Sequence, residues 1–279
     1  MSSWMRLLAF ALCSMCLASF AASETKGPDA LPANLPEAAR SFTKGYSWLV
    51  QGAKVVYDFE GIDTRKTDAG TVQEKTTGVI EIECTKIVEG KAEIQCTSRL
   101  TGGEIVDEKG AKNAVSFAGE IPVTMRYLAT ERGNPQIVST EKDFATEITK
   151  VGQGPHREMY GRPFRGADLA LLEMPSPEDK PDDIGYFAWR GSQRVGGAAR
   201  QLACEASPLG NQMVIIGRDT GRGPQPSSLG ITDEQGRLTH NKGLTEAVAA
   251  VFEGGRIKSA EYRVSIGERT MMARITEKR

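Results

Sequence analysis

The residue types that most often carry out catalysis or bind metals are sparse in this sequence of 279 residues. Its two histidines, His156 and His240, stand beside no nucleophile motif such as G-x-S-x-G. It contains no H-E-x-x-H motif, and its one C-x-x-C spacing, Cys13 to Cys16, lies in the hydrophobic N-terminal segment. The sequence therefore predicts no catalytic residue, no metal site and no cofactor.

Paired carboxylates are the one catalytic chemistry that the sequence leaves open. Asp58, Glu81, Glu83 and Glu261 fall in segments that we predict to be strands, where two facing acids could serve as the acid and base of a hydrolase. Acids on the solvent side of a strand usually have no such role. A secreted hydrolase that uses a carboxylate pair is therefore kept as an alternative.

A calcium site is suggested by spacing and then excluded by the residues inside it. Asp63 and Glu74 stand at the first and twelfth positions of a calcium-loop frame. Within that frame Arg65 replaces an acid, and Asp68 occupies the position that needs glycine. We therefore predict that residues 64–76 form a polar hairpin tip.

Cationic and aromatic residues alternate in the segment HREMYGRPFR, residues 156–165. Such a segment can bind a sugar, a phosphate or an acidic partner through its charges and rings. More often the aromatic residues simply attach a loop to its domain. The candidate partner-contact residues are Arg157, Tyr160, Arg162, Phe164 and Arg165.

Composition and charge exclude several classes of protein. The sequence is 39% hydrophobic, which is enough apolar material for a folded core. Lys and Arg number 35 against 36 Asp and Glu, so the chain lacks the basic surface that displaces counterions from nucleic acid. We expect no nucleic-acid partner and a soluble globular protein.

The first 22 residues predict export. Arg6 precedes an uncharged, largely apolar run from Leu7 to Phe20, and the small residues Ala21 and Ala22 follow. These are the charged start, apolar centre and cleavage site of a signal peptide. The run is shorter than the roughly 20 residues of a membrane span, and an uncleaved N-terminal anchor is the alternative. We expect cleavage near Ala22, no transmembrane helix in the mature chain, and a periplasmic or extracellular location.

Period-two alternation of apolar residues predicts a mainly β fold. Short alternating runs bounded by Gly, Asn or Asp begin at Val55 and continue to the C-terminus. Two hairpin turns are expected near the end, at residues 253–256 and 267–268. One or two short helices are expected, one with Ala39 and Phe42 at helical spacing and one around Phe144. The antiparallel strands would form a curved sheet or two half-barrel-like repeats.

Proline-rich segments divide the chain. The predicted organisation is a signal peptide at 1–22, a Pro-rich arm at 23–36, a first β unit at 37–152, a Pro-rich crossing at 153–184 and a second β unit at 185–279. An internal repeat is suggested because several residues recur at offsets of 107 or 108. The recurring residues are Gly78, Val88, Gly90, Cys96 and Gly102 in the first unit and Gly185, Val195, Gly197, Cys204 and Gly210 in the second.

The register of one predicted hairpin places two cysteines. A three-residue loop at residues 89–91 keeps the apolar residues of both strands on one face and sets Cys84 directly opposite Cys96. Opposed residues lie within the range of a disulfide, which an oxidising compartment favours. We predict a Cys84–Cys96 disulfide, with two buried thiols as the alternative, and a lone thiol at Cys204.

The favoured function is non-catalytic: binding of an apolar or lipid-like ligand, or a role in the cell envelope. A structural or interaction module of an envelope assembly is the further alternative. A carrier would need one inward apolar face, part of it left uncovered by helices, because a fully packed face is only a core. The residues expected to line that face are Ile80, Ile82, Ile94, Val123, Met125 and Tyr127.

Overall fold

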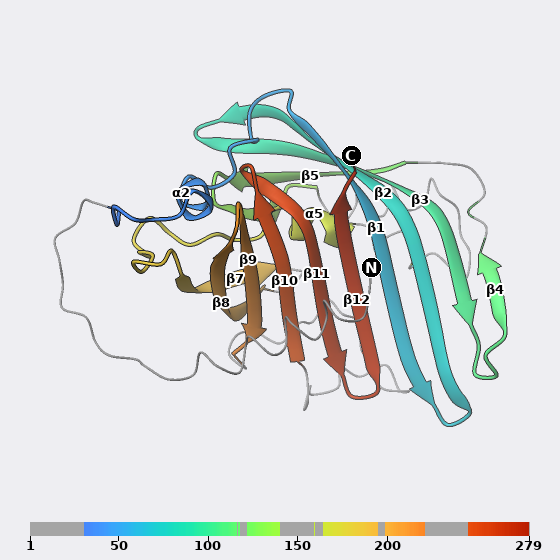
Figure 1. Ribbon diagram of the computed structural model, residues 1–279. Coiled ribbons are helices and arrows are strands. Elements are labelled where there is room, and N and C mark those ends of the chain that lie inside the picture. The colour runs from blue at the N-terminus through green and yellow to red at the C-terminus, as the bar shows by residue number, and fades with distance from the viewer. Residues whose placement is uncertain are drawn as a thin grey trace. The chain divides into compact units, whose positions relative to one another are not determined.

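The structure is a computed structural model, and it describes residues 31–115, 117, 122–139, 159, 164–194, 199–220 and 245–278. The chain divides into two compact units, Met1–Leu31 and Pro32–Arg279. The second unit is built on one large antiparallel sheet (Figure 1). The mainly β fold class is therefore confirmed.

The strands are long in the N-terminal part of the sheet and shorter towards its ends. The bounds are β1 (Lys54–Thr67), β2 (Gly70–Val88), β3 (Lys91–Val106), β4 (Lys112–Val115), β5 (Val123–Thr130), β6 (Gly133–Ile137), β7 (Phe187–Arg194), β8 (Ala199–Leu209), β9 (Gln212–Asp219), β10 (Thr245–Glu253), β11 (Arg256–Ile266) and β12 (Arg269–Glu277). With a rise of about 3.3 Å per residue, the 19 residues of β2 span about 60 Å.

The first and last strands of the described chain lie side by side at the centre of the sheet. Its strand order is β6-β5-β3-β2-β1-β12-β11-β10-β9-β8-β7, and β4 pairs with β3 off this path. The last strand, β12, thus lies beside the first, β1, and all the ladders between neighbours are antiparallel. The sheet curls so far that its two outermost strands, β6 and β7, come into contact.

Two short helices lie on one face of the sheet, which we call the inner face. Helix α2 (Glu37–Thr43) packs on β8, β9 and β10, and Phe42 contacts the rings of Phe187 and Phe252 at centroid distances of 5.3 and 5.2 Å. Helix α5 (Phe164–Ala170) packs on β2, β3, β11 and β12. The helix expected around Ala39 and Phe42 is confirmed, whereas the one expected around Phe144 lies outside the described residues.

The predicted hairpins are observed where glycine or a short polar turn interrupts the alternation. The β10–β11 turn contains Gly254 and Gly255, both with positive φ, and the β11–β12 turn contains Gly267 with φ of 55°. The segment expected as a polar hairpin tip, residues 64–76, does contain the β1–β2 turn, but β1 runs to Thr67 and β2 begins at Gly70, so most of the segment is strand. Local sequence therefore determines the places where the chain reverses.

The predicted register of the two cysteines is wrong. Cys84 lies opposite Ile94, and Cys96 lies opposite Ile82. The turn has two residues, Glu89 and Gly90, and an irregularity between Cys84 and Lys86 restores the apolar residues to the inner face. The two cysteines are therefore diagonal neighbours, about 7 Å or more apart, where a disulfide requires the backbone to move.

The structure has three buried free thiols among the residues it describes: Cys84, Cys96 and Cys204. Burial raises the pKa of each of them, and that of Cys204 reaches about 12. The predicted Cys84–Cys96 disulfide is thus absent from the structure, and the alternative of two buried thiols describes it. Cys204 is a lone buried thiol, as expected.

Strands from both predicted β units belong to the same sheet. The crossing predicted at 153–184 contains α5, which the sequence did not indicate because seven residues with one glycine show no clear helical period. Two of the recurring glycines differ in their setting, since Gly102 lies within β3 and Gly210 lies in the turn after β8. The internal repeat stays a prediction.

Candidate functional site

The six residues expected to share an inward face do share it. Their exposed fractions run from 0% to 5%, and their strands β2, β3 and β5 are neighbours. Helix α5 lies directly on this region, because a Cβ atom on Gly166 would overlap the side chain of Ile80 and lie 3.0 Å from Ile275 Cγ2. These residues are therefore hydrophobic core and form no open binding surface.

Beside the bulky residues that α5 covers, the inner face also carries small side chains. Gly61 of β1 lies opposite Ala273 of β12. Gly78 of β2 lies opposite Phe59, the inward residue that precedes Gly61 on β1. Leu100 of β3 and Tyr262 of β11 flank these small residues on the same face. We call these five residues the small-residue layer, and all five are buried.

The next inward positions carry charge. Asp63 and Arg65 follow on β1, Glu74 faces Asp63 from β2, and Arg269 faces Arg65 from β12. Like charges are thus directly opposed, and opposite charges meet along the diagonals. We call these four residues the charged cluster.

A bidentate ion pair organises the charged cluster. Arg269 donates from Nε to Asp63 Oδ1 at 2.9 Å and from Nη2 to Asp63 Oδ2 at 2.5 Å. Arg65 Nη2 lies 3.4 Å from Asp63 Oδ2 and 3.3 Å from Glu74 Oε1. The side chain of Asp63 is only 3% exposed. A buried carboxylate in this setting depends on its guanidinium partners, because an uncompensated charge in the interior is costly.

The cluster also explains why the calcium frame fails. Asp63 and Glu74 do face each other, but the guanidinium of Arg65 bonds to both acids. A cation is thus already supplied by the chain itself. Across the described residues, no group of His, Cys, Asp or Glu side chains is arranged to hold a metal ion.

A second polar contact lies on the inner face of β10 and β11. The hydroxyl of Tyr262 donates a hydrogen bond of 2.9 Å to Glu246 Oε1, and both residues are buried. Glu246 lies opposite Val264 in the β10–β11 ladder. The inner face beyond α5 thus combines small and apolar side chains with buried polar groups that have partners.

The carboxylates considered for a hydrolase lie on the opposite, outer face and form ion pairs there. Lys54 Nζ lies 2.9 Å from Glu81 and 3.4 Å from Glu83, and Arg274 Nη2 lies 2.6 Å from Glu261. Partial burial would raise the pKa of Glu261, but hydrogen bonds and charge from Arg274 and Arg263 lower it overall. A general acid needs a raised pKa, so this geometry gives the hydrolase alternative no support.

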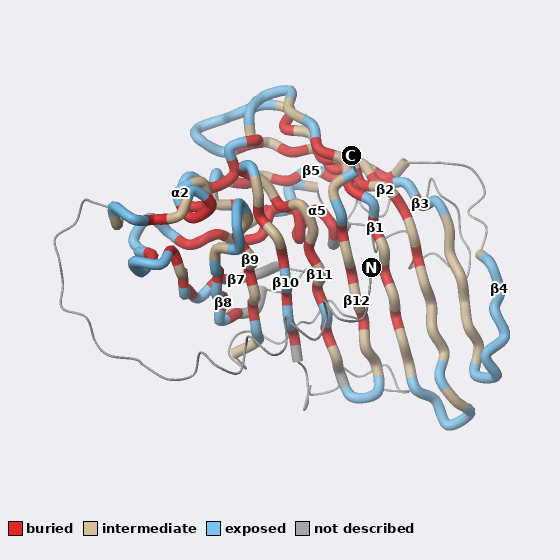
Figure 2. Tube along the Cα trace, in the orientation of Figure 1, coloured by how far each residue is buried: buried red, intermediate tan, exposed pale blue. Residues whose placement is uncertain are grey.

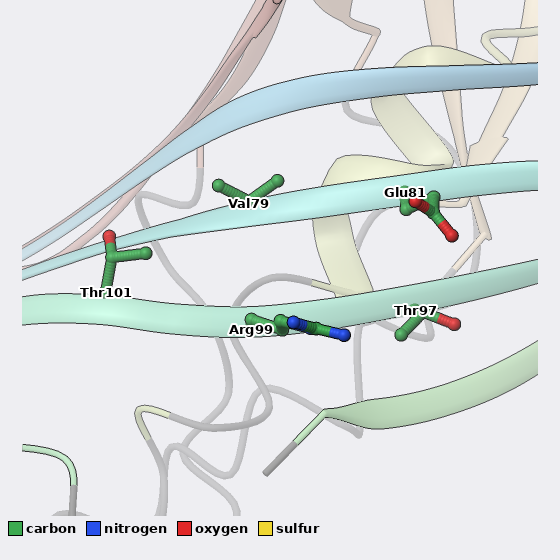
Figure 3. Close-up of a pocket in the computed structure, with 5 residues that line it drawn as sticks. All are labelled: Val79, Glu81, Thr97, Arg99 and Thr101. Carbon is green, nitrogen blue, oxygen red and sulfur yellow. The ribbon is translucent and has the colours of Figure 1, made fainter. Parts of the chain in front are cut away.

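The outer face also has a shallow hollow of about 320 Å³ over β2 and β3. Figure 3 shows its lining side chains on the side of the sheet away from α5. They are Val79, Glu81, Thr97, Arg99 and Thr101. Glu81 is held by Lys54, and the hydroxyls of Thr97 and Thr101 contact those of Thr124 and Thr77. The polar groups of the hollow therefore bond chiefly to neighbouring strands.

The predicted partner-contact segment lies mostly outside the described residues. Arg157, Tyr160 and Arg162 fall there, as do both histidines, while Phe164 and Arg165 begin α5. The charged cluster was not found from sequence as a site. The available indication was the odd-numbered series in β1, where Asp63 and Arg65 continue the inward positions of Tyr57 and Phe59.

Comparison with solved structures finds a distant similarity in fold. A solved structure titled "Lipid-protein interactions in lipovitellin" matches 82% of this chain with a TM-score of 0.48 and 13% sequence identity. The present chain spans about a quarter of that protein, since the match covers 25% of it. No family model and no curated protein matches the sequence. A similarity this distant brings no property of lipovitellin to this chain.

Proposed function

We propose that the protein is an exported, non-catalytic binding protein that holds an apolar or lipid-like ligand against the small-residue layer. The observation that carries this proposal is the loss of side-chain volume at buried inward positions of β1, β2 and β12, next to a helix much shorter than the strands. The strand β2 spans about 60 Å, whereas α5, with seven residues, is about 10 Å long. Of the described helices, α2 and α5 alone pack on the inner face, and α5 sets Gly166 against Ile80 and Ile275.

The chemistry of the small-residue layer favours a hydrocarbon chain. Gly61, Gly78 and Ala273 remove side-chain volume across three adjacent strands, and Leu100 and Tyr262 supply apolar walls. Each methylene group that a ligand transfers from water to such a surface stabilises the complex by about 0.8 kcal/mol. The charged cluster begins one inward position further on and would contact a polar end of the ligand.

Export is part of this proposal because of the N-terminal sequence. No helix among the described residues is long and apolar enough to cross a membrane. The mature chain should begin between Ala21 and Glu24, where small residues meet the cleavage rule. Intact-mass measurement of the exported protein tests this. An exported chain that still carries residues 1–20 would contradict it.

The binding test uses a substitution that fills the layer and a matched control on the other face. Ala273→Trp places a large ring over Gly61 on the inner face, whereas Met272→Trp places the same ring on the outer face of β12. We expect the mature protein to bind a fluorescent fatty acid. We expect Ala273→Trp to weaken binding by about tenfold or more and Met272→Trp to leave it unchanged.

Two outcomes would overturn the proposal. The first is a folded wild-type chain that binds neither the fluorescent fatty acid nor any component of a lipid extract. The second is a folded Ala273→Trp variant that binds the probe as tightly as wild type. If Ala273→Trp does not fold, the wild-type protein is exposed to lipid extract and examined by native mass spectrometry. A bound lipid supports the proposal, and its absence contradicts it.

A further inference from the structure

The tip of the β2–β3 hairpin projects beyond its neighbours in the sheet. The first residue of β1, Lys54, lies opposite Glu83, and the ladder between β3 and β5 ends at Ala92 opposite Ala129. Residues 85–91 therefore extend past both flanking strands (Figures 1 and 2). No described strand lies beside this tip to cover its side chains.

The projecting tip carries an exposed apolar side chain on each of its faces. Ile87 and Val88 are 46% and 44% exposed, although a hairpin tip is ordinarily polar. Because successive side chains of a strand point to opposite faces, one of the two lies on each side of the hairpin. Val50, 57% exposed, lies in the loop that is tied to the hairpin base by a 2.8 Å bond from Gly52 N–H to Cys84 O.

The charges around the tip are balanced. Lys86 pairs with Glu93 at 3.1 Å, and the turn itself carries Glu89 beside Lys91. Lysine side chains can extend from an apolar surface to water, which suits residues at the boundary of a lipid layer. Balanced charge means that attraction to an anionic surface cannot be the main source of binding.

We propose that this hairpin tip inserts into the surface of a lipid bilayer, driven by Ile87 and Val88. A flat protein partner would contact only one face of the hairpin, whereas a fluid lipid layer surrounds both. Three exposed side chains also offer far less area than the roughly 800 Å² per partner of a stable protein interface. The inference rests on the proposed function, because a lipid-like ligand is taken up from a membrane or delivered to one.

Vesicle binding of the mature chain tests the inference directly. We expect the protein to sediment with phosphatidylcholine vesicles, and a tenfold rise in salt to change this binding by less than about twofold. The double variant Ile87→Asp with Val88→Asp should lower binding by about tenfold or more. The matched control is Leu209→Asp, which changes an apolar residue that is 66% exposed in another hairpin, and it should bind as wild type does.

Tryptophan fluorescence tests the inference without relying on the folding of the double aspartate variant. Val88→Trp should show a blue shift on adding vesicles, and Leu209→Trp should show none. Absence of vesicle binding by wild type, or equal binding by the folded double variant, overturns the inference. The double variant should still bind the fluorescent fatty acid in solution. A chain that binds vesicles but no fatty acid would contradict the proposed function alone.

Discussion

The inner face of the sheet is built in two different ways along the same strands. In β1, Tyr57 and Phe59 pack in the core near α5, and four residues later the same inward series presents Asp63 and then Arg65. The apolar part is stabilised by burial under a helix. The charged part is stabilised by a bidentate ion pair. The difference teaches that alternation in a strand predicts which face a residue occupies, but not what that face does.

The largest effect should come from a charge in the helix-covered part. Met125 is 5% exposed on the inner face, so Met125→Lys should destabilise the fold by about 4 kcal/mol or more or prevent folding. Met272→Lys makes the same change on the outer face of β12 and should stay within about 0.5 kcal/mol. Urea unfolding measures both. Equal effects of the two substitutions would mean that the two faces are wrongly assigned.

A smaller but still large effect is expected in the charged cluster. Arg269→Ala removes the bidentate partner of Asp63 and should destabilise the fold by about 2–3 kcal/mol, because the carboxylate stays buried. Lys112→Ala breaks an exposed pair with Glu104 and should cost less than about 0.5 kcal/mol. Denaturant unfolding measures both variants, and adding Asp63→Asn and the double variant Asp63→Asn/Arg269→Ala completes a cycle that gives the coupling between Asp63 and Arg269. A loss below about 0.5 kcal/mol for Arg269→Ala would show that the pair is not structural.

The smallest effect is a pH dependence at Glu277, which lies near the end of β12 opposite the inward residue Tyr57. Partial burial would raise the pKa of Glu277, but Lys258 and Arg256 lower it overall through hydrogen bonds and charge. A carboxyl whose pKa is lower in the folded than in the unfolded state stabilises the fold above its ordinary pKa. That contribution is lost as the pH falls from about 5 through the lowered value. Glu277→Gln should therefore make stability less steeply dependent on pH between about 5 and 3, as measured by urea unfolding. An unchanged slope would contradict the assignment.

Much of the fold could be predicted from local sequence. Period-two alternation indicates the strands, glycines mark the two C-terminal hairpins, and helical spacing places α2 around Phe42. The six inward residues of β2, β3 and β5 are buried together as alternation requires. These features depend on neighbours within a few residues, which is why the sequence carries them.

The cysteine register shows where local reasoning fails. Parity predicts a three-residue loop if the hairpin is regular, since a two-residue loop would turn one apolar face to water. The hairpin has the two-residue loop and corrects the faces with one irregularity beside Cys84. An irregularity of this kind leaves the apolar pattern of the sequence intact. Alternation alone therefore cannot distinguish a regular hairpin with a three-residue loop from an irregular one with a two-residue loop.

The sequence by itself determined the strands, the turns, the inward series and the absence of familiar catalytic motifs, because each is a property of short segments. The tertiary structure decided what each part of the inner face became. It brought β12 beside β1, so that Arg269 meets Asp63 across 206 residues of chain. It also laid α5 over Ile80 and Ile275 and turned the expected binding surface into core. Both outcomes depend on contacts between distant segments, whose closeness no local pattern of residues records.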